Sequence, residues 1–257
     1  MLDRFDLYEL CAQAPLRDAR FLRAIHGRDP RVLGEDFSGG GAIARQWVQV
    51  VPDGRAVAVD RDPEPLERMR GVKGITVVCD DVRNATHKVD IIADLNFSIC
   101  EIHARKDLVA YLAHARSRLK KHGVFVADIY GGSDAYFTGR ISQRKTAPSG
   151  EKVTYYWEQR HADALTGRVV NVMHFNVVPK TTGGKKARTI EVREAFIYNW
   201  RLWSVQELRE LLLEAGFSAV HALWEKTDDD GDDTGVFYEP KRIDNQEKWW
   251  TFIVAER

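Results

Sequence analysis

Short apolar runs alternate with helical stretches through the first half of the chain. The runs lie at 31–36, 55–59, 75–78, 89–95 and 123–129, and each has the length of a buried strand. Before the last of them, residues 105–119 place Leu108, Leu112, Ala115 and Leu119 on one helical stripe. Strands that alternate with helices predict a parallel sheet with right-handed crossover connections.

The pattern changes between about residues 152 and 201. Three segments there alternate apolar and polar residues with a period of two, and no helix separates them. Turn-forming residues at 164–167 and 182–185 connect the segments. We expect an antiparallel β flap, residues 145–202, that is inserted into the α/β domain and has no core of its own.

The helix–strand alternation returns at Ser204. Ser204 and Glu207 form a predicted capping box, the helix ends at Gly216, and strands follow at 218–224 and 249–255. At the other end of the chain, residues 1–30 contain two short helices, which we expect to form a helical cap. The prediction is one α/β domain, residues 1–257, with a doubly wound, mostly parallel, Rossmann-like sheet of seven strands. Its last two strands form an antiparallel pair.

Composition narrows the possible partners. The formal net charge is zero, so no overall field attracts nucleic acid or an anionic membrane, and we expect neither as a partner. No run approaches the ~20 apolar residues of a membrane helix, and the start of the chain does not resemble a signal peptide. The three cysteines form no CxxC pair and no HExxH motif occurs, so no metal site is predicted. These features indicate a cytoplasmic protein.

The strongest chemical signal lies in residues 32–42, where a strand leads into a glycine turn and the start of a helix. Residues 39–44 match G-x-G-x-x-A, a loose pattern for dinucleotide binding. Acidic residues end the successive strands at Glu35, Asp60 and the pair Asp80 and Asp81. Because parallel strands place their carboxyl ends at one edge, these acids should line the edge where ligands bind. An acid at the end of the second strand can bind two ribose hydroxyls, and one after the third can accept a hydrogen bond from an exocyclic amine.

From about residue 32 to residue 129, and again in the closing helix and two strands, the chain resembles the class I S-adenosylmethionine-dependent methyltransferases. The resemblance implies S-adenosylmethionine as cofactor and a small-molecule methyl acceptor as partner. Phe37 departs from the family pattern because it stands at the position of the first glycine, so the loop geometry could differ.

Individual roles follow from that resemblance. Asp60 matches the ribose-binding acid, Asp81 with the backbone of Val82 matches the adenine contact, and Leu95 to Phe97 match the segment facing the transferable methyl. The complete set of expected cofactor-binding residues is Glu35, Ser38, Gly39, Gly41, Asp60, Arg61, Asp80, Asp81, Val82 and Leu95.

The acceptor is narrowed mainly by what the sequence lacks. The fourth strand ends in Ala-Asp-Leu-Asn-Phe-Ser rather than the [DNS]-P-P-[YFW] of base-amino methylases. Six of the seven tryptophans lie in the predicted flap or later, where they either pack the flap or form aromatic walls that suit an amine. The acidic run 227–233 is either a solvated loop or a gate for a cationic acceptor.

We therefore favour an amine over an oxygen acceptor. An amine needs only to be neutral when it attacks, whereas an oxygen nucleophile needs a base, for which His103, Asp128 and Tyr130 are near strand ends. The positions we expect to serve in catalysis, by positioning or as a base, are Asn96, His103 and Tyr130.

Two alternatives stay open. The chain could be a nicotinamide-dependent oxidoreductase, which the glycine pattern permits, or a non-catalytic cofactor-binding partner subunit. The identity of the acceptor and the oligomeric state are left open by the sequence.

Overall fold

The computed structural model describes residues 2–180, 188–228 and 233–257. Contacts divide the chain into two compact units. The larger contains Ala14–Ser133 and Trp203–Arg257, and the smaller contains Met1–Gln13 and Asp134–Leu202.

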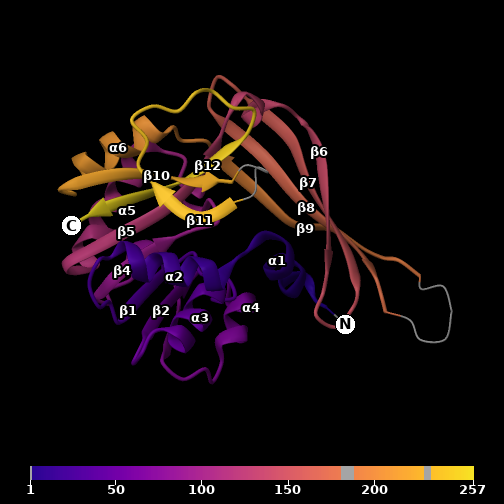
Figure 1. Ribbon diagram of the computed structural model, residues 1–257, viewed down its shortest axis with the longest axis horizontal. Helices are drawn as coiled ribbons and strands as arrows, with labels where there is room; N and C mark the ends of the chain where they lie inside the picture. The colour runs from indigo at the N-terminus through magenta and orange to yellow at the C-terminus, as the bar shows by residue number, and fades with distance from the viewer. Residues whose placement is uncertain (1, 181–187, 229–232) are drawn as a thin grey trace. The chain divides into compact units, whose positions relative to one another are not determined.

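A mixed, mostly parallel sheet forms the larger unit (Figure 1). Its strand order is β11-β10-β12-β5-β4-β1-β2-β3. Strands β1 to β5 are parallel, whereas β12 pairs antiparallel with both β5 and β10. The strand bounds are β1 (Val32–Asp36), β2 (Arg55–Asp60), β3 (Ile75–Cys79), β4 (Val89–Asp94), β5 (Leu119–Gly131), β10 (Ala219–Thr227), β11 (Asp233–Tyr238) and β12 (Trp249–Glu256).

The predicted large parallel sheet with a closing antiparallel pair is confirmed, but the predicted count of seven strands is wrong. The eighth strand, β11, pairs antiparallel with β10. It follows the acidic run, whose residues 229–232 lie outside the described part of the chain. Its apolar residues Val236 and Phe237 are too few to stand out as a strand in a polar stretch.

Helices cover both faces of this sheet. The helix bounds are α2 (Pro15–Ile25), α3 (Ala42–Val50), α4 (Pro63–Leu66), α5 (Arg105–Arg118) and α6 (Val205–Glu214), with short 3-10 turns η1 (Glu67–Met69), η2 (Val82–Asn84) and η3 (Ser98–Glu101). On one face, Phe21 and Leu22 of α2 and Trp47 of α3 join a buried apolar cluster with alternate residues of the strands. On the other face, Tyr111 of α5 contacts Phe125 of β5. The sheet is thus doubly wound, as predicted.

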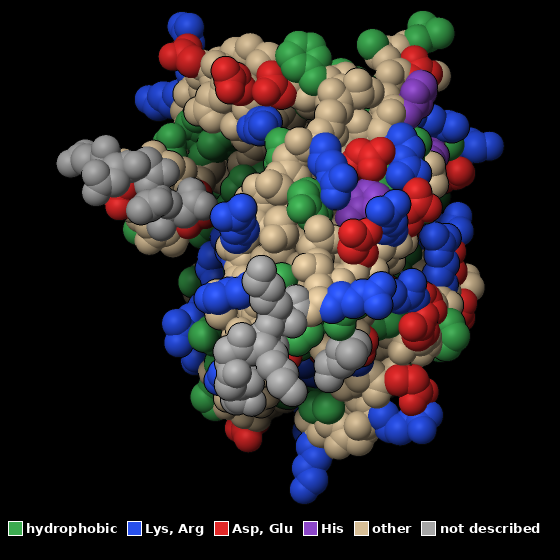
Figure 2. All heavy atoms as spheres, turned by 90° about the vertical axis from the view of Figure 1, so that its right-hand side faces the viewer, with side chains coloured by type: hydrophobic (Ala, Val, Ile, Leu, Met, Phe, Trp, Pro, Cys, Tyr) green, Lys and Arg blue, Asp and Glu red, His purple; other side chains and the backbone are tan. Residues whose placement is uncertain are grey.

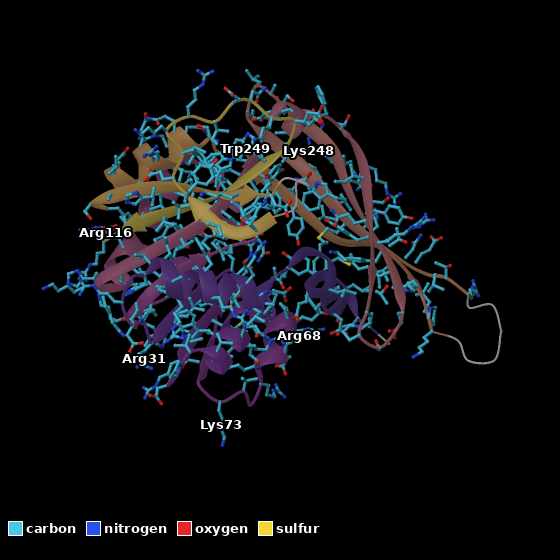
Figure 3. The ribbon with its side chains drawn as sticks, in the orientation of Figure 1. Arg31, Arg68, Lys73, Arg116, Lys248 and Trp249 are labelled. Carbon is cyan, nitrogen blue, oxygen red and sulfur yellow. The ribbon has the colours of Figure 1, made fainter. Side chains whose placement is uncertain are left out.

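Local sequence explains where several of these elements begin. Pro15 stands in the first turn of α2, where its missing N–H costs nothing. The predicted capping box of α6 is present, because Ser204 accepts from the Glu207 N–H and Glu207 accepts from the Ser204 N–H. At the end of β5, a Cβ on Gly131 would lie 2.3 Å from the ring of Trp249, which Figure 3 labels, so only glycine admits this ring.

A four-stranded antiparallel sheet forms the smaller unit, in the order β6-β7-β8-β9. Its elements are β6 (Gly139–Thr146), β7 (Lys152–Asp163), β8 (Arg168–Val178), β9 (Ile190–Arg201) and α1 (Arg4–Ala12), with the short turn η4 (Ser133–Tyr136) at the boundary between the units. The antiparallel segment is therefore present, with β6 as a strand that the sequence pattern did not reveal. The predicted turn at 182–185 lies outside the described residues.

Two expectations about this region are wrong. The segment has a core of its own, in which Leu7 of α1 packs against Val153, Met173 and Phe175 of the sheet. The N-terminal helices also do not form one cap, since α1 belongs to the smaller unit and α2 to the larger. The reason is the apolar face of β7 and β8, which α1 covers; a period-two pattern reveals such a face but not what covers it.

Charge of both signs is distributed over the surface. On the face drawn in Figure 2, Lys and Arg side chains alternate with Asp, Glu and His side chains. This mixture agrees with the formal net charge of zero. Across the described residues, no helix has both the length and the apolar character that crossing a membrane requires.

Candidate functional site

The glycine loop joins β1 to α3 at the carboxyl edge of the parallel strands. It is fastened to β2, because the Ser38 N–H donates to the Val59 carbonyl at 3.0 Å. Phe37 has a φ of 54°, in the left-handed region that glycine favours, and its ring meets Tyr111 edge-on at 5.9 Å between centroids. The departure at Phe37 therefore leaves a glycine-like backbone turn, at some conformational cost.

The two predicted loop glycines have different surroundings. A Cβ on Gly41, whose φ is 63°, would lie 2.0 Å from Sδ of Met69, so this position has no room for a side chain. A Cβ on Gly39, whose φ is 50°, would meet no atom within 4 Å. Gly41 is thus required for packing, whereas Gly39 borders open space that a ligand can approach.

Ser38 has the most informative side chain of the loop. The residue is 5% exposed, and its hydroxyl has no hydrogen-bond partner within the described part of the chain. Buried hydroxyls are normally paired, because an unpaired one loses its bonds to water without compensation. A polar ligand at this loop would supply the missing partner.

Glu35 is buried at the end of β1. Its Oε2 accepts the Ala44 N–H of the first turn of α3 at 2.7 Å. A carboxylate on the first N–H groups of a helix stabilises both the helix and its own charge. Glu35 therefore orients the helix that the glycine loop enters.

Asp60 at the end of β2 links two loops. Its Oδ2 accepts the Gly39 N–H at 2.7 Å, and its Oδ1 accepts the Asp62 N–H at 2.9 Å. Each oxygen of an ionised carboxylate accepts about two hydrogen bonds, so one lone pair per oxygen is left for a ligand. Two such accepting oxygens fit a pair of ribose hydroxyls, which would donate to them.

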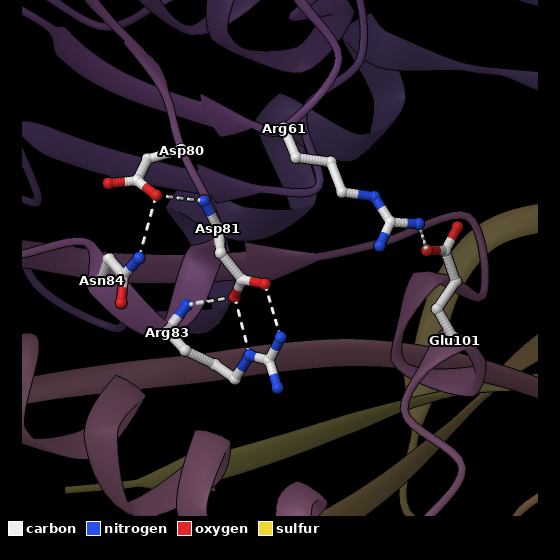
Figure 4. Close-up of polar contacts among 6 residues, drawn as sticks. All are labelled: Arg61, Asp80, Asp81, Arg83, Asn84 and Glu101. Carbon is white, nitrogen blue, oxygen red and sulfur yellow. Dashed lines mark hydrogen bonds and ion pairs between the residues drawn. The ribbon is translucent and has the colours of Figure 1, made fainter.

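The acids after β3 are partly engaged (Figure 4). Asp80 Oδ1 accepts from the Asp81 N–H at 2.7 Å and from Asn84 Nδ2 at 2.9 Å. The Asp81 carboxylate accepts the Arg83 N–H and two guanidinium N–H groups, at 2.9, 2.7 and 2.5 Å. These bonds lower the pKa of Asp81 to about 2. Val82 is buried beside them, and an incoming amine must share Asp81 with Arg83.

Arg61 connects the end of β2 with the turn after β4. Its guanidinium lies 3.2 Å from Oε2 of Glu101 in η3, as Figure 4 shows, and its charge also acts on Asp81. Burial raises the pKa of Glu101, as does the charge of Asp60, whereas Arg61 and His103 lower it. His103 thus lies within electrostatic reach of Glu101.

The turn after β4 contains the remaining predicted residues. Leu95 is buried, whereas Asn96 and Phe97 are consecutive non-glycine residues with φ of 61° and 63°. The Phe97 ring lies 5.0 Å from that of Tyr130, with the planes at 63°. The structure therefore brings Asn96 close to Tyr130, through Phe97, while His103 lies on the Glu101 side.

Sequence reasoning named Asp128 only as a possible base and missed its contacts. Its carboxylate accepts the N–H groups of both Asn96 and Phe97. The signal available was one charged residue inside the apolar run 123–129. A charge at such a position indicates a specific partner, because an unpaired buried charge is costly.

A second buried polar cluster lies on the α5 face of the sheet and was missed entirely. Arg118 donates to both oxygens of Asp36, at 2.7 and 3.0 Å, and Tyr111 donates to the same carboxylate at 3.1 Å. Asp94 is fully buried, and neither of its oxygens meets a donor in good geometry among the described residues. Burial, with the charge of Asp36, raises the pKa of Asp94 well above its ordinary value, and the nearby Tyr111 hydroxyl opposes the shift.

Two further features bear on the choice of site. A hollow of about 350 Å³ lies at the opposite, amino edge of β1 to β3, beside His87 and Lys88, away from the acids described above. Ligands of open α/β sheets bind at the carboxyl edge instead. Among the described residues, no group of three or more His, Cys, Asp or Glu side chains could hold a metal ion.

Comparison with known proteins identifies solved structures that share this fold. No family model and no curated protein sequence matches the chain. Among solved structures, an S-adenosylmethionine-dependent methyltransferase from Clostridium acetobutylicum has 16% identity, covers 97% of this chain and 96% of its own, and has a TM-score of 0.65. The S-adenosylmethionine-bound amino pentose methyltransferase CalS10 from Micromonospora echinaspora has 13% identity, coverage of 100% and 98%, and a TM-score of 0.69.

A third similar structure is the sugar N-methyltransferase KedS8 from a Streptoalloteichus species. It has 15% identity, covers 100% of this chain and 94% of its own, and has a TM-score of 0.66. The chain therefore has the fold of class I S-adenosylmethionine-dependent methyltransferases along its whole length. The resemblance inferred from the glycine loop and the strand-end acids is confirmed at the level of the fold.

Proposed function

We propose that this protein is an S-adenosylmethionine-dependent methyltransferase that acts on a small molecule. The observation that carries the proposal is the arrangement at the carboxyl edge, where the glycine loop lies beside Asp60 and its Ser38 hydroxyl has no hydrogen-bond partner within residues 2–180, 188–228 and 233–257. An unpaired buried hydroxyl beside a carboxylate with spare lone pairs fits a ligand that has a polar amino-acid end and a ribose.

The donor set suggests which residues hold the cofactor. Ser38, Gly39 and Gly41 would surround its methionine end, Asp60 its ribose, and Asp81 with the Val82 backbone its adenine. Glu35 would act through α3, and Arg61, Asp80 and Leu95 would complete the surrounding wall. When bound, S-adenosylmethionine supplies a methyl group on a positively charged sulfur.

For the acceptor we favour an amine over an oxygen nucleophile. Two of the structurally similar proteins are described as amino pentose and sugar N-methyltransferases. Aromatic side chains, which attract ammonium groups, are grouped in each unit: Trp157, Tyr198 and Trp200 stack in the smaller, and Arg17 already lies 5.2 Å from the Trp250 ring in the larger.

The protein's own task in such a reaction is positioning. Transfer of a methyl group between two bound molecules gains most from holding them in line, close together and away from water. Asn96, which precedes Phe97 in the turn, and Tyr130, whose ring contacts that of Phe97, would orient the acceptor. His103 would be the proton acceptor if the substrate is an alcohol.

The sheet topology disfavours the nicotinamide alternative. Dinucleotide-binding folds of the Rossmann type use a parallel sheet in the order 3-2-1-4-5-6. Here the strand beside β5 is β12, which runs antiparallel to it. The glycine pattern alone does not outweigh that difference.

Calorimetric titration tests the cofactor directly. We expect the purified protein to bind S-adenosylmethionine and S-adenosylhomocysteine, and not NADH or NADPH. Binding of a nicotinamide cofactor without S-adenosylmethionine would reject the proposal. Incubation with a panel of small amines and alcohols, followed by mass spectrometry, should then reveal a product heavier by one methylene unit. Binding without turnover of any metabolite in a cell extract would favour the non-catalytic partner subunit.

A further inference from the structure

The carboxylate of Asp128 holds the turn after β4 by accepting hydrogen bonds from the backbone of that turn. It lies near the carboxyl end of β5, and its Oδ2 and Oδ1 accept the N–H groups of Asn96 and Phe97 at 3.1 and 2.7 Å. Asp128 itself is 8% exposed. Two consecutive N–H groups thus converge on one buried carboxylate from the neighbouring strand.

The backbone at this turn needs such an anchor. Both Asn96 and Phe97 have positive φ, which is unfavourable for residues with a side chain. Unfavourable conformations persist only where surrounding contacts hold them, and they concentrate at functional sites. The other bonds of the turn are local: Ser98 Oγ donates to the Leu95 carbonyl at 2.9 Å, and the Cys100 N–H to the Phe97 carbonyl at 3.0 Å.

The anchored turn presents groups that suit a cation. The Phe97 ring is set edge-to-face with Tyr130, which lies two residues beyond Asp128 on β5 and therefore points to the same face of the sheet. Aromatic rings attract positive charge, and a carboxylate behind them adds to that attraction.

We propose that Asp128 is a positioning residue, which holds the Leu95–Phe97 turn so that Phe97 and Asn96 face the positively charged sulfur of the bound cofactor. This role rests on the proposed function. It adds to that function a residue that acts through the backbone of the turn and touches neither reactant.

The surroundings of Asp128 make the anchor sensitive to pH. The pKa of Asp128 is raised to about 7, chiefly by burial and also by the charge of Asp18, against the Phe97 and Asn96 N–H groups, which lower it. Asp18 belongs to α2, where Phe21 stacks on Phe252, the residue paired with Asp128 in the β5–β12 ladder. Asp94 of β4 and Cys100 of η3 also lie within its electrostatic reach.

Asp90 provides a matched control at the opposite edge of the sheet. Its Oδ2 also accepts two consecutive N–H groups, those of Arg31 and Val32, at 3.0 and 2.8 Å. A change to asparagine removes the carboxylate charge at either position. At Asp128, where the two N–H groups use different oxygens, it also replaces one accepting oxygen by an NH₂ group, whereas at Asp90 both N–H groups use the one oxygen that asparagine keeps. Only Asp128 lies beside the proposed site.

The first measurement compares the affinities of S-adenosylmethionine and S-adenosylhomocysteine, which differ in the charge on sulfur. In Asp128→Asn we expect the preference for the charged ligand to fall about threefold to tenfold, corresponding to one or two lost hydrogen bonds. In Asp90→Asn the preference should stay as in the wild type. In the wild type, the preference for S-adenosylmethionine should increase as the pH rises through about 7, because Asp128 then ionises. In Asp128→Asn this pH dependence should disappear.

A third variant distinguishes the loss of the hydrogen bonds to the turn from the loss of a nearby negative charge. Asp18→Asn removes a neighbouring negative charge without touching the turn, so it should change the preference much less than Asp128→Asn. An equal fall in both variants, or an unchanged preference in Asp128→Asn, would overturn the proposed role.

Amide measurements test the anchor without any cofactor. In the free wild-type protein, the Asn96 and Phe97 amide signals should titrate with a midpoint of about pH 7. Their hydrogen exchange should be at least about tenfold faster in Asp128→Asn and unchanged in Asp90→Asn. If the Asn96 and Phe97 amide signals do not shift with pH, and their hydrogen exchange is unchanged in Asp128→Asn, the proposed anchor is refuted. A wild type with normal amide titration that binds neither ligand would instead refute the proposed function, and with it the role at sulfur.

Discussion

Acidic side chains on the two faces of the sheet have different kinds of partners. Glu35 and Asp36 are consecutive residues of β1, so their side chains point to opposite faces. On the α5 face, Asp36 is neutralised by the guanidinium of Arg118, and burial, which raises the pKa of Asp94, favours the protonated form of that group. On the α3 face, Glu35 and Asp60 accept backbone N–H groups instead.

The difference shows which acids can serve a ligand. A buried acid that is paired with a guanidinium, or that holds its own proton, has no charge left to offer and acts as scaffold. Hydrogen bonds from backbone N–H groups favour the ionised form of an acid, and Asp60 keeps a lone pair on each oxygen for a ligand. Charge-bearing carboxylates therefore gather on the side where the glycine loop lies, and the α5 face supports them from behind.

Loss of Arg118 should give the largest effect. Arg118→Ala leaves the carboxylate of Asp36 buried without its cation, and breaking such a pair costs about 3–5 kcal/mol of unfolding free energy. Denaturant unfolding followed by circular dichroism measures the change. Arg105 lies on the same helix and is paired with Glu214 in an exposed position, so Arg105→Ala should have little effect. Equal losses in the two variants would contradict the assignment of the α5 face as scaffold.

A change at Asp94 should act in the opposite direction. Because the pKa of Asp94 is raised in the folded protein, folding takes up a proton above the ordinary aspartate pKa of about 4, and stability falls as the pH rises above that value. Asparagine resembles the protonated acid in shape, and it needs no proton uptake on folding. Asp94→Asn should therefore match the wild type near pH 4 and be more stable by at least about 1 kcal/mol at pH 7, since one pKa unit corresponds to about 1.4 kcal/mol.

Unfolding titrations at several pH values would follow this difference. A variant that is destabilised equally at every pH would mean that Asp94 is ionised and paired in the native state.

On the α3 face, the expected effect is on binding rather than on stability. Asp60→Ala should weaken S-adenosylmethionine binding by about 1–3 kcal/mol through lost charge-assisted hydrogen bonds. Asp62, two residues later, accepts the Glu64 N–H as a helix cap, and Asp62→Ala should keep the affinity of the wild type. Calorimetry of both variants decides the matter, and an unchanged affinity in Asp60→Ala would mean that the ribose lies elsewhere.

The fold was predictable where its pattern is local. The five parallel strands and the helix over residues 105–118 appear in the sequence as short apolar runs and one apolar stripe, and the structure has them within a few residues. Strand β11 and the pairing of α1 with the antiparallel sheet were missed, because a strand with few apolar residues and a helix with a short apolar face carry weak periodicity.

In the candidate site, too, some features could be predicted from the sequence and others could not. The glycine turn and the acids at the strand ends could be found because parallel topology carries every strand end to one edge. What each acid contacts could not be found, since Asp81 meets Arg83 through a local turn, whereas Asp128 meets Asn96 from a strand 32 residues away. Their roles as cofactor contacts stay predictions.

By itself, the sequence determined the class of fold, the sheet edge at which the proposed site lies and the acidic residues gathered there. These depend on hydrophobic period and on residue type, which the chain carries locally. Only the tertiary structure decided that Asp36 is neutralised by Arg118 and that Asp128 supports the turn after β4. The same holds for the Ser38 hydroxyl, which has no hydrogen-bond partner among the residues that the structure describes. The physical reason is that burial and hydrogen-bond partners arise from segments distant in the chain, and they determine whether a carboxylate keeps its charge.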